Sequence, residues 1–505
     1  MKALHLTLPT AALALLPLPA VWAQDAGQTQ TISIVPRVSV TETLTDNVNL
    51  SGTAARSELT TEISPGIRLD IQGARLKTYL DYSLTHVNYA RGSSGSRLQN
   101  ALNTFGTFEA VDNLAFVDFS GNISQQTISA FGTQSTSNTA INANQTEVAN
   151  YRVSPYIKGQ LGNIANYEAR ISQAVTSADN AATFDTTNTN SSVRVTNAST
   201  FRRLGWSADV GRQQSSYDAG RTTKSDTYSL GLTYEVTPQV RLSANAGQEA
   251  NNFTSLDKQT YSTHSVGLTW QPSQRTTVSA LTGKRSFGNT HNVSFEHRSA
   301  RTVWRFTDSK DVSTPGEQNG FGTVGNVYDL FYNQLEGSGL TPAQRALRVN
   351  QLLQQYGINP NIPVVSSFLT SAASVQRSQN LSFALLGVRD TITFLLTRTE
   401  SFRLDTLVSA IDNLSDANTV TQNGFSINYS HRLTPDYSMG VVLSRQATSG
   451  STAAQDTTLK SLNLSLSGQV GKNTAASLGL RHVVSDNGAN PYTENAVTGN
   501  LNVQF

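Results

Sequence analysis

Polar and apolar residues alternate along several long segments of the chain. From position 58 to 71, apolar side chains take every second place and polar side chains fill the places between: Leu59, Ile63, Pro65, Ile67, Leu69 and Ile71 against Glu58, Thr60, Glu62, Ser64, Arg68 and Asp70. Segments 150–161 and 226–236 repeat the pattern. A period of two is typical of a β-strand with one apolar face, and a tilted strand needs about 9–11 residues to cross a bilayer. The alternation predicts membrane-spanning strands, although a water-soluble sandwich would alternate as well.

Short turns and long loops follow one another between these segments. Tight polar turns recur at 72–73, 112–113, 162–163, 237–239, 271–274, 388–390, 434–436 and 471–473, and near Arg203 and Ala300. Longer loops rich in Ser, Thr, Asn and Gly lie between them, for example at 126–146, 177–190 and 485–492. Bacterial barrels have short turns in the periplasm and longer loops outside the cell. We therefore predict an all-β fold, a single large antiparallel transmembrane β-barrel of about 22 strands (range about 16–24), with both ends on the periplasmic side.

Composition separates a barrel from other classes of polar chain. Charged residues make up only 14% of the 505 residues, whereas an ordinary soluble domain carries roughly 25%. A disordered chain would also be polar, but it would lack the 16 Tyr and 19 Phe present here. The net charge of +2 offers no basic face for nucleic acid.

The two ends of the sequence predict where the protein is found. Residues 1–23 have the pattern of a cleavable signal peptide, with Lys2, an apolar run from Ala11 to Ala20, and Ala23 before the cut. Residues 24–505 are then the barrel. The last segment alternates again and stops at Phe505, which resembles the signal read by the barrel assembly machinery. We expect a protein of the Gram-negative cell outer membrane, with outer-membrane lipid and that machinery as partners.

Aromatic and proline residues add local expectations. Trp206, Trp270 and Trp304 lie close to predicted periplasmic turns, as do Tyr167, Tyr234 and Phe116, and such rings favour the lipid–water boundary. Pro65 and Pro155 fall inside predicted strands, where each removes a ladder hydrogen bond, so we expect a bulge at each. Asp118 should face inward if Val117 and Phe119 face lipid.

One long segment, 314–376, is not strand-like. Thr341 as N-cap, Pro342 at the first helical position and Gly357 just past the end frame an amphipathic segment, and this arrangement predicts a helix. This partly helical insert begins on the extracellular side and is either a surface loop or a constriction folded into the lumen. We favour partial occlusion, because a loop of this length without a function is uncommon. Deleting 314–376 should then raise single-channel conductance.

The search for chemistry finds no catalytic, cofactor-binding or metal-ligating constellation. Gly320 to Gly325 matches a dinucleotide-binding spacing by letter, but it lacks the preceding strand and the following helix start. No Gly-x-Ser-x-Gly element is present. The histidines beyond the signal peptide are scattered, and only His291 and His297 are close. We predict that the protein is not an enzyme and needs no cofactor. An outer-membrane hydrolase would require a Ser or Asp beside His431 or His482 at the barrel rim.

The polar faces of the strands predict the lining of the pore. The predicted lumen-facing residues are Glu58, Glu62, Arg68, Asp70, Lys77, Tyr79, Asp81, Arg152, Tyr156, Lys158, Glu168 and Arg170. Their balanced signs indicate a wet, nearly neutral interior without strong ion preference. Tyr79 and Tyr156 are candidates to stack on sugar rings.

The segment from Pro36 to Val48, with the sequence PRVSVTETLTDNV, and Ser64-Pro65-Gly66-Ile67 after it resemble the opening of a known family. The chain resembles the PEP-CTERM system-associated outer-membrane proteins, which accompany exosortase and exopolysaccharide gene clusters. The similarity runs through the whole chain after the signal peptide, including the insert before Ser378 and the Leu381 to Leu396 hairpin. The resemblance implies an outer-membrane location and a link to exopolysaccharide export, but it supplies no catalytic or binding residues. Related barrel families also begin with a Thr-Asp-Asn element.

Four functions remain open on the sequence. The first is a channel or scaffold for exopolysaccharide or envelope export, with export components as partners and the 314–376 insert as gate. The alternatives are a general solute porin, an outer-membrane hydrolase and a soluble β-rich adhesin.

Overall fold

The computed structural model of the protein describes residues 31–505 apart from 180–184, 198–202, 219, 314–331, 333–344, 346–348, 350–367, 371–372, 406, 408–411 and 489. Its strands are β1 (Thr31–Thr45), β2 (Glu58–Gln72), β3 (Leu76–Tyr89), β4 (Arg97–Val111), β5 (Ala115–Thr127), β6 (Gln145–Leu161), β7 (Ala165–Ala178), β8 (Thr186–Asn197), β9 (Leu204–Tyr217), β10 (Thr223–Thr237), β11 (Val240–Asn251), β12 (Gln259–Ser273), β13 (Thr276–Arg285), β14 (Gly288–Arg298), β15 (Thr302–Ser313), β16 (Ser374–Leu386), β17 (Asp390–Arg403), β18 (Thr419–Arg432), β19 (Tyr437–Ser449), β20 (Thr457–Gly471), β21 (Thr474–Asn487) and β22 (Tyr492–Gln504).

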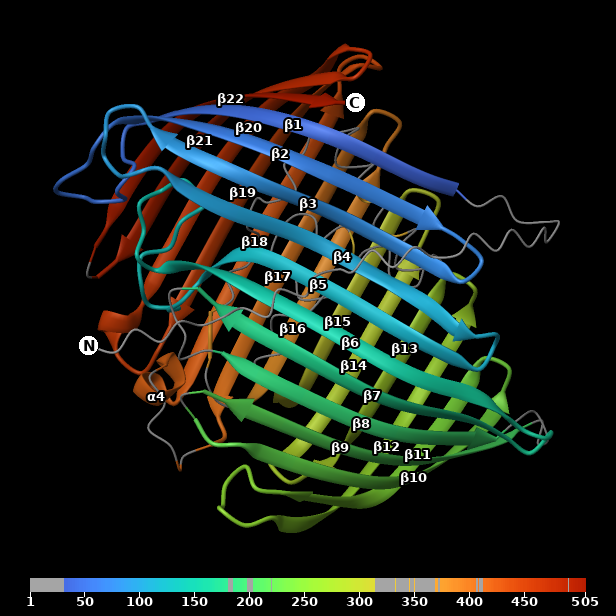
Figure 1. The fold of residues 1–505 in the computed structure, drawn as a ribbon. Helices are drawn as coiled ribbons and strands as arrows, with labels where there is room; N and C mark the ends of the chain where they lie inside the picture. The colour runs from blue at the N-terminus through green and yellow to red at the C-terminus, as the bar shows by residue number, and fades with distance from the viewer. Residues whose placement is uncertain are drawn as a thin grey trace.

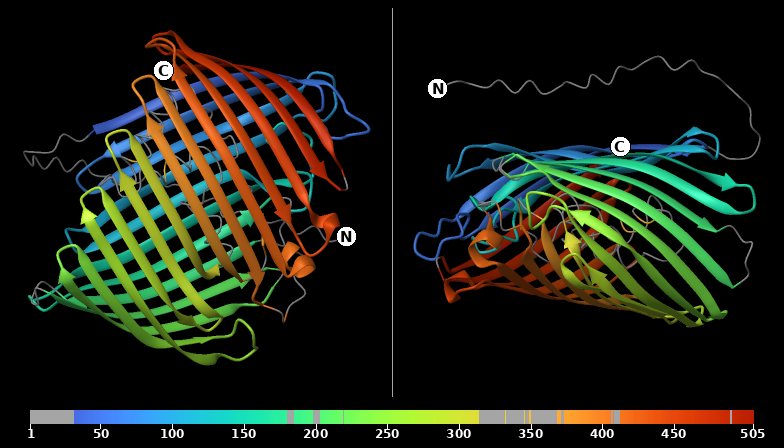
Figure 2. Two further views of the ribbon diagram at one scale, coloured as in Figure 1. Left: turned by 180° about the vertical axis from the view of Figure 1, so that it is seen from behind. Right: turned by 90° about the horizontal axis from the view of Figure 1, so that it is seen from below.

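These 22 strands form one closed antiparallel sheet, shown from three sides in Figure 1 and Figure 2. Each strand pairs with the next along the chain, and β22 pairs with β1 to close the ring. The closing pairs run from Arg37 opposite Gln504 to Thr45 opposite Ala496. A closed sheet leaves no unpaired edge, which is what a strand structure requires in hydrocarbon. The predicted all-β barrel and its strand number are confirmed.

The alternation in the sequence becomes an outer and an inner face. On β20, Leu462, Leu464 and Leu466 point outward and are 36%, 39% and 45% exposed. Ser461, the residue before Leu462, lies on the inner face, where its hydroxyl hydrogen-bonds the Ser444 hydroxyl of β19 at 2.7 Å. Apolar side chains therefore cover the outside while short polar groups line the inside, as lipid and water on opposite faces require.

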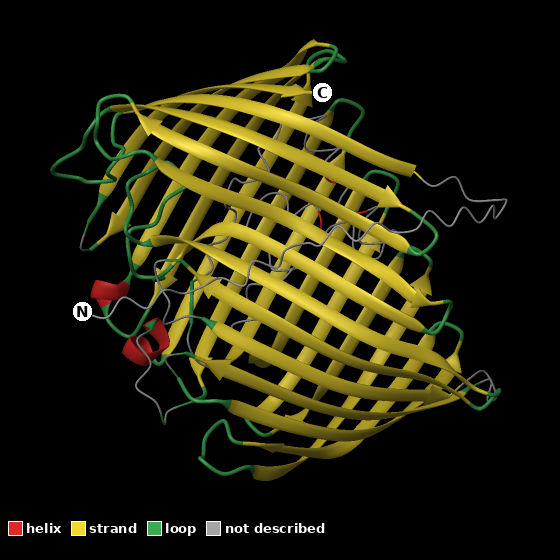
Figure 3. Ribbon diagram, in the orientation of Figure 1, coloured by secondary structure: helices red, strands yellow, loops and turns green. Residues whose placement is uncertain are grey.

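The two ends of the barrel differ in the length of their connections, as Figure 3 shows. At one end, which we call the turn end, strands are joined by a few residues, and β1 begins and β22 ends there. Asn113 and Gly162 adopt left-handed φ values of 53° and 55° in two of these turns. At the other end, the loop end, connections such as 46–57 and 128–144 are longer. The short helix α4 (Asn413–Ala417) and the 3-10 turn η2 (Ala453–Gln455) lie in loops at that end.

The aromatic residues near the turns divide between the two faces. Trp206, Trp270 and Trp304 lie on the outward face close to the turn end, each opposite an outward-facing residue of the neighbouring strand. Phe116 does not belong to this set, so its assignment to the outer girdle is wrong. It stands opposite Tyr156 on the inner face, and the two rings stack with centroids 5.1 Å apart.

The prolines interrupt the ladder without forming bulges. Pro65 leaves a gap in the β2–β3 pairing, and Pro155 leaves a gap in the β6–β7 pairing, but the register is the same on both sides of each gap. The expected bulges are therefore absent, because each proline removes a donor but no residue is added. In each gap a side-chain hydrogen bond joins the two strands instead: Ser64 with Thr85 at 2.9 Å, and Ser154 with Ser172 at 2.8 Å.

Most of the predicted insert and the whole signal peptide lie outside the described residues. Within the insert, Tyr332, Arg345 and Val349 are helical, and the Arg345 guanidinium lies 4.8 Å from the Tyr332 ring centroid. Two of these positions fall in the segment predicted as an amphipathic helix. A search of the described part of the chain found no helix with the length and hydropathy needed to span a membrane.

Candidate functional site

The register places all twelve predicted lumen residues on the inner face of β2, β3, β6 and β7. Direct cross-strand partners share a face. Arg68 is paired with Asp81, Asp70 with Tyr79, and Lys158 with Glu168, so the two residues of each pair lie on the same face. The remaining members follow by alternation along the same strands: Glu58, Glu62, Lys77, Arg152, Tyr156 and Arg170. Whether they line a conducting pore stays a prediction.

One cluster on this wall is centred on Asp81. Its carboxylate accepts hydrogen bonds from Arg68 Nε and Nη2, both at 3.2 Å, and from Tyr79 Oη at 3.3 Å. Arg37 of β1 forms a second ion pair with the same carboxylate. The ring of Tyr79 is almost fully buried and stacks on Phe105 at 5.4 Å, so it presents no face to a sugar. The cluster leaves one positive charge in excess.

A second cluster is centred on Arg170. Its guanidinium donates to Asp118 Oδ2 at 2.7 Å and to Glu168 Oε1 at 3.0 Å. It also lies 3.8 Å from the centroid of the Tyr156 ring, which is a cation–π distance. Lys158 lies 4.4 Å from the centroid of the neighbouring Phe116 ring. Asp118 faces inward as expected, and Tyr156 is already covered by Arg170 on one side.

Glu58 has a structural position at the loop end of β2. Its fully buried carboxylate accepts hydrogen bonds from the backbone N–H groups of Arg91 and Ser93 at 2.7 Å and 3.0 Å. It therefore holds the β3–β4 loop against the rim. Glu58 faces inward, but its bonds are used within the protein.

The inner wall as a whole is nearly neutral and rich in hydroxyl and amide groups. Across the described strands, fifteen basic and thirteen acidic residues face inward by register. On β17–β20, Arg403 and Arg432 face inward at strand ends and Leu395, Val420, Val442 and Leu459 are inward and apolar. The other inward residues are mostly uncharged and polar, among them Thr391, Thr393, Thr397, Ser401, Gln422, Ser426, Asn428, Ser430, Ser444, Gln446 and Ser461. Such a wall hydrogen-bonds its contents without selecting strongly for either sign of charge.

Residues 128–144, the β5–β6 connection, which we call the mouth loop, extend across the loop end of the barrel. On its own side of the ring, Tyr89 Oη of β3 donates to the Thr139 carbonyl at 2.9 Å. Arg97 Nη2 of β4 donates to the carbonyls of Asn138 and Ala140 at 2.6 Å and 3.1 Å. These bonds turn the loop inward over the strands rather than away from the barrel.

The mouth loop also contacts the seam between β22 and β1. The Ile141 N–H donates to the Val48 carbonyl at 2.8 Å, and Tyr492 Oη of β22 donates to the Gln134 carbonyl at 2.6 Å. Asn487 Nδ2 donates to the Phe131 carbonyl at 3.2 Å. Backbone groups of the loop are thus satisfied by several different strands.

Two further contacts cross the ring. The Ala130 N–H donates to Asn413 Oδ1 of α4 at 2.8 Å, and Asn413 Nδ2 donates to Ser129 Oγ at 2.9 Å. The Leu369 N–H donates to the Ile128 carbonyl at 3.2 Å, next to a parallel bridge between Thr127 and Phe368. Strands β5 and β16 stand eleven places apart in the ring of 22, so these contacts join opposite walls.

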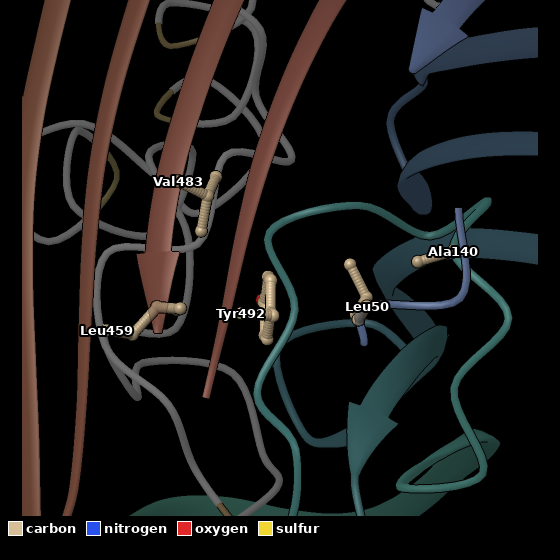
Figure 4. Packing of buried hydrophobic residues seen from close by; sticks show 5 residues of the cluster. All are labelled: Leu50, Ala140, Leu459, Val483 and Tyr492. Atoms are coloured by element: carbon tan, nitrogen blue, oxygen red, sulfur yellow. The ribbon is translucent and has the colours of Figure 1, made fainter. Parts of the chain in front are cut away.

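Small apolar clusters hold the mouth loop in place. Each cluster of buried apolar residues found in the described chain contains a residue of this loop: Ala140, Ala130 with Phe131, Ile128, or Ile141. Figure 4 shows the first, where Leu50, Ala140 and Tyr492 meet Leu459 and Val483 of the inner wall. Leu369, at the end of the insert, packs with Val148 and Ala178 in another. The core of this barrel is therefore at its loop end.

Sequence reasoning recognised 126–146 only as a polar loop and missed its role. The available signal was the apolar content of the segment, because Ile128, Phe131 and Ile141 have no reason to occur in a loop surrounded by water. The gate was predicted in 314–376 instead. Of that insert, the described residues Phe368 and Leu369 contact the mouth loop and the strand leading into it.

The residues named for a hydrolase are placed at the rim. His431 Nδ1 lies 2.7 Å from Asp390 Oδ1, and Tyr429 Oη donates to the same oxygen at 2.8 Å. All three face outward at the turn end. His482 Nδ1 lies 2.7 Å from Asn495 Oδ1 on the outward face at the loop end. The aspartate that the hydrolase alternative requires beside His431 is therefore present as Asp390. Among the described residues, no serine hydroxyl is hydrogen-bonded to either ring, and no group of three or more His, Cys, Asp or Glu side chains could hold a metal ion.

The closed 22-stranded barrel is similar in fold to solved barrel-shaped receptors and transporters. The FrpB iron transporter from Neisseria meningitidis (F5-1 variant, apoprotein form) is 8% identical over 93% of this chain and 81% of that chain, with a TM-score of 0.50. The siderophore receptor PirA from Pseudomonas aeruginosa is 10% identical over 95% and 81%, with a TM-score of 0.44. The ferric-catecholate import receptor Fiu from E. coli K12 is 8% identical over 94% and 82%, with a TM-score of 0.47. No protein-family model matches the chain, and no curated protein does. These neighbours are transport receptors rather than enzymes, and the likeness concerns the fold alone.

Proposed function

We propose that the protein is an outer-membrane channel that is closed at rest by the mouth loop and serves the export of an exopolysaccharide. The observation that carries the channel is the crossing of the lumen by residues 128–131, which hydrogen-bond α4 and the end of the insert on the opposite wall. A passage that is blocked at one end by a loop of its own chain is a gated passage.

The cargo is inferred from the wall and the sequence. A nearly neutral inner surface of hydroxyl and amide groups suits a polyhydroxylated polymer, which exchanges hydrogen bonds with water for hydrogen bonds with the wall. The opening segment from Pro36 to Val48 resembles that of proteins that accompany exopolysaccharide clusters.

Planar-bilayer recordings of the refolded protein test this function. We expect low conductance from the intact protein and several-fold higher conductance after deletion of 128–141, which removes the crossing residues, or of 314–373, the part of the insert that precedes β16. Deletion of 256–257, two exposed residues of the β11–β12 loop, is the control and should change nothing. An intact protein that is already fully open would be a general solute porin, and the gate would be abandoned.

The cargo is tested in the same chamber. Neutral dextran oligomers added to the 128–141 deletion variant should produce reversible, length-dependent interruptions of the current. If ions pass freely and no oligosaccharide interrupts the current, the proposed channel is supported and the exopolysaccharide cargo is rejected. The two parts of the proposed function therefore fail separately.

A further inference from the structure

The outer wall of the barrel carries an uneven distribution of charge near the loop end. On the outward faces of β13–β20 there are six cations, which we call the cationic belt: Lys284, Lys310, Arg377, Arg398, Arg445 and Lys460. The same region of β13–β21 has three carboxylates: Asp308, Glu400 and Asp486. The outward faces of β1–β12 show the opposite balance, with two cations (Arg212 and Lys224) and three carboxylates (Glu42, Glu147 and Asp226).

The cationic belt lies directly above the apolar surface of the same strands. Going from the loop end toward the turn end, Lys460 is followed on its face by Leu462 and Leu464, and Arg445 by Leu443. Side chains two residues apart on one face of a strand are about 7 Å apart along it. The belt is therefore at the depth of the lipid head groups on the side of the long loops.

Several of these cations repel one another within the protein. Arg445 stands directly opposite Lys460, and Lys310 directly opposite Arg377. Like charges in direct cross-strand pairs are destabilising. Arg377 is compensated by Asp308 at 2.8 Å. Lys284, Arg445 and Lys460 form no ion pair with any described residue, so the wall presents positive charge that the chain leaves uncompensated.

An apolar groove adjoins the belt on the outer surface. It has a volume of about 530 Å³ and is lined by the apolar residues Leu44, Leu462, Leu464, Leu480 and Val497, with Asp46, Arg91, His482 and Asn495 among its polar residues. It spans the seam from β20 across β22 to β1. Leu462 and Leu464 lie on β20, the strand that carries Lys460, so the groove adjoins the belt at that strand.

We propose that the cationic belt and this groove bind a phosphorylated glycolipid of the outer leaflet, with its phosphates on the belt and an acyl chain in the groove. The charge of the belt is complementary to phosphate, and the apolar surface below it favours a phosphate that is attached to a membrane lipid. Dissolved phosphate would gain nothing from the groove. This inference does not depend on what the barrel transports.

Binding of a defined lipid tests the inference. The refolded protein in neutral detergent micelles is titrated with bisphosphorylated hexa-acyl lipid A and, separately, with the same lipid after removal of its phosphates, and bound lipid is counted by native mass spectrometry. We expect the phosphorylated lipid to bind at least tenfold more tightly. The triple variant Lys310→Gln, Arg445→Gln, Lys460→Gln should lose roughly tenfold in affinity, since it removes three of the cations that would pair with phosphate and each exposed pair contributes little.

The matched control is Arg212→Gln with Lys224→Gln on the opposite wall, which should bind as the unmodified protein does. Heat-modifiable mobility on a detergent gel reports whether each variant is folded, and the single variant Arg445→Gln replaces the triple variant if that one does not fold. Equal binding of the dephosphorylated lipid, an equal loss in the control, or full competition by inorganic phosphate would each overturn the proposal.

Discussion

The contact between Asn413 and the mouth loop gives a prediction whose size follows from the structure. The Asn413 side chain accepts a hydrogen bond from the Ala130 N–H at 2.8 Å and donates one to Ser129 Oγ at 2.9 Å. In Asn413→Ala the Ala130 N–H, whose residue is 1% exposed, loses its partner. Leaving a buried donor without a partner costs about 1–3 kcal/mol. Because the penalty is relieved when the loop opens, we expect the open population to rise roughly 5- to 150-fold.

The rate at which a buried thiol becomes accessible measures this opening. The chain has no cysteine, so Ser137→Cys places a single reporter at a buried position of the mouth loop. Its rate of labelling by a membrane-impermeant maleimide should rise by about fivefold or more when Asn413→Ala is added. Asn49→Ala is the matched control, because Asn49 bonds Ala54 and Arg56 within its own loop. An unchanged rate in Asn413→Ala, or an equal rise in the control, would refute the idea that this bond holds the mouth closed.

Two further predictions concern the walls. Leu464→Arg places a charge on the lipid-facing side and should lower the free energy of unfolding by about 2–4 kcal/mol. Asn463→Arg on the inner face should change this free energy by less than about 1 kcal/mol. Urea unfolding in lipid vesicles measures both variants, and equal free energies would contradict the assignment of the faces. Asp81→Asn leaves Arg37 and Arg68 without their shared carboxylate, so stability should fall by about 1–3 kcal/mol and the reversal potential in a salt gradient should move toward anion preference. A reversal potential that stays in place would show that this cluster does not face the conducting path.

The strands were predictable because the signal is local. Whether a residue faces lipid or water is decided by its neighbours two positions away, so the alternation in 58–71 placed Glu58 and Arg68 on the inner face without knowledge of any partner strand. The same rule placed Asp118 inward. The same alternation rule would have placed Phe116 correctly. Phe116 is two residues before Asp118 and therefore lies on the same inner face, whereas its proximity to a turn was the weaker signal.

The mouth loop and the charge clusters were not predictable because they depend on contacts between distant segments. The pairing of Ala130 with Asn413 requires the closed ring that brings opposite walls within reach of one loop. Arg37 joins Asp81 only because β1 and β3 both flank β2 in a fixed register. The contacts beside the prolines were unpredictable for the same reason. The sequence shows that each proline lacks an N–H donor, but the hydrogen bond between Ser64 and Thr85 can be recognised only once the strand register is known.

The seam between β1 and β22 has a consequence for the way the molecule is made. Its paired residues, such as Arg37 and Gln504, are among the most widely separated in the chain, and contacts of long sequence separation form late and slowly. Until they form, two rows of unpaired backbone groups remain, which hydrocarbon does not tolerate. A chain stalled before its final strand therefore has no stable partial state in the bilayer, and insertion is expected to be a single concerted step.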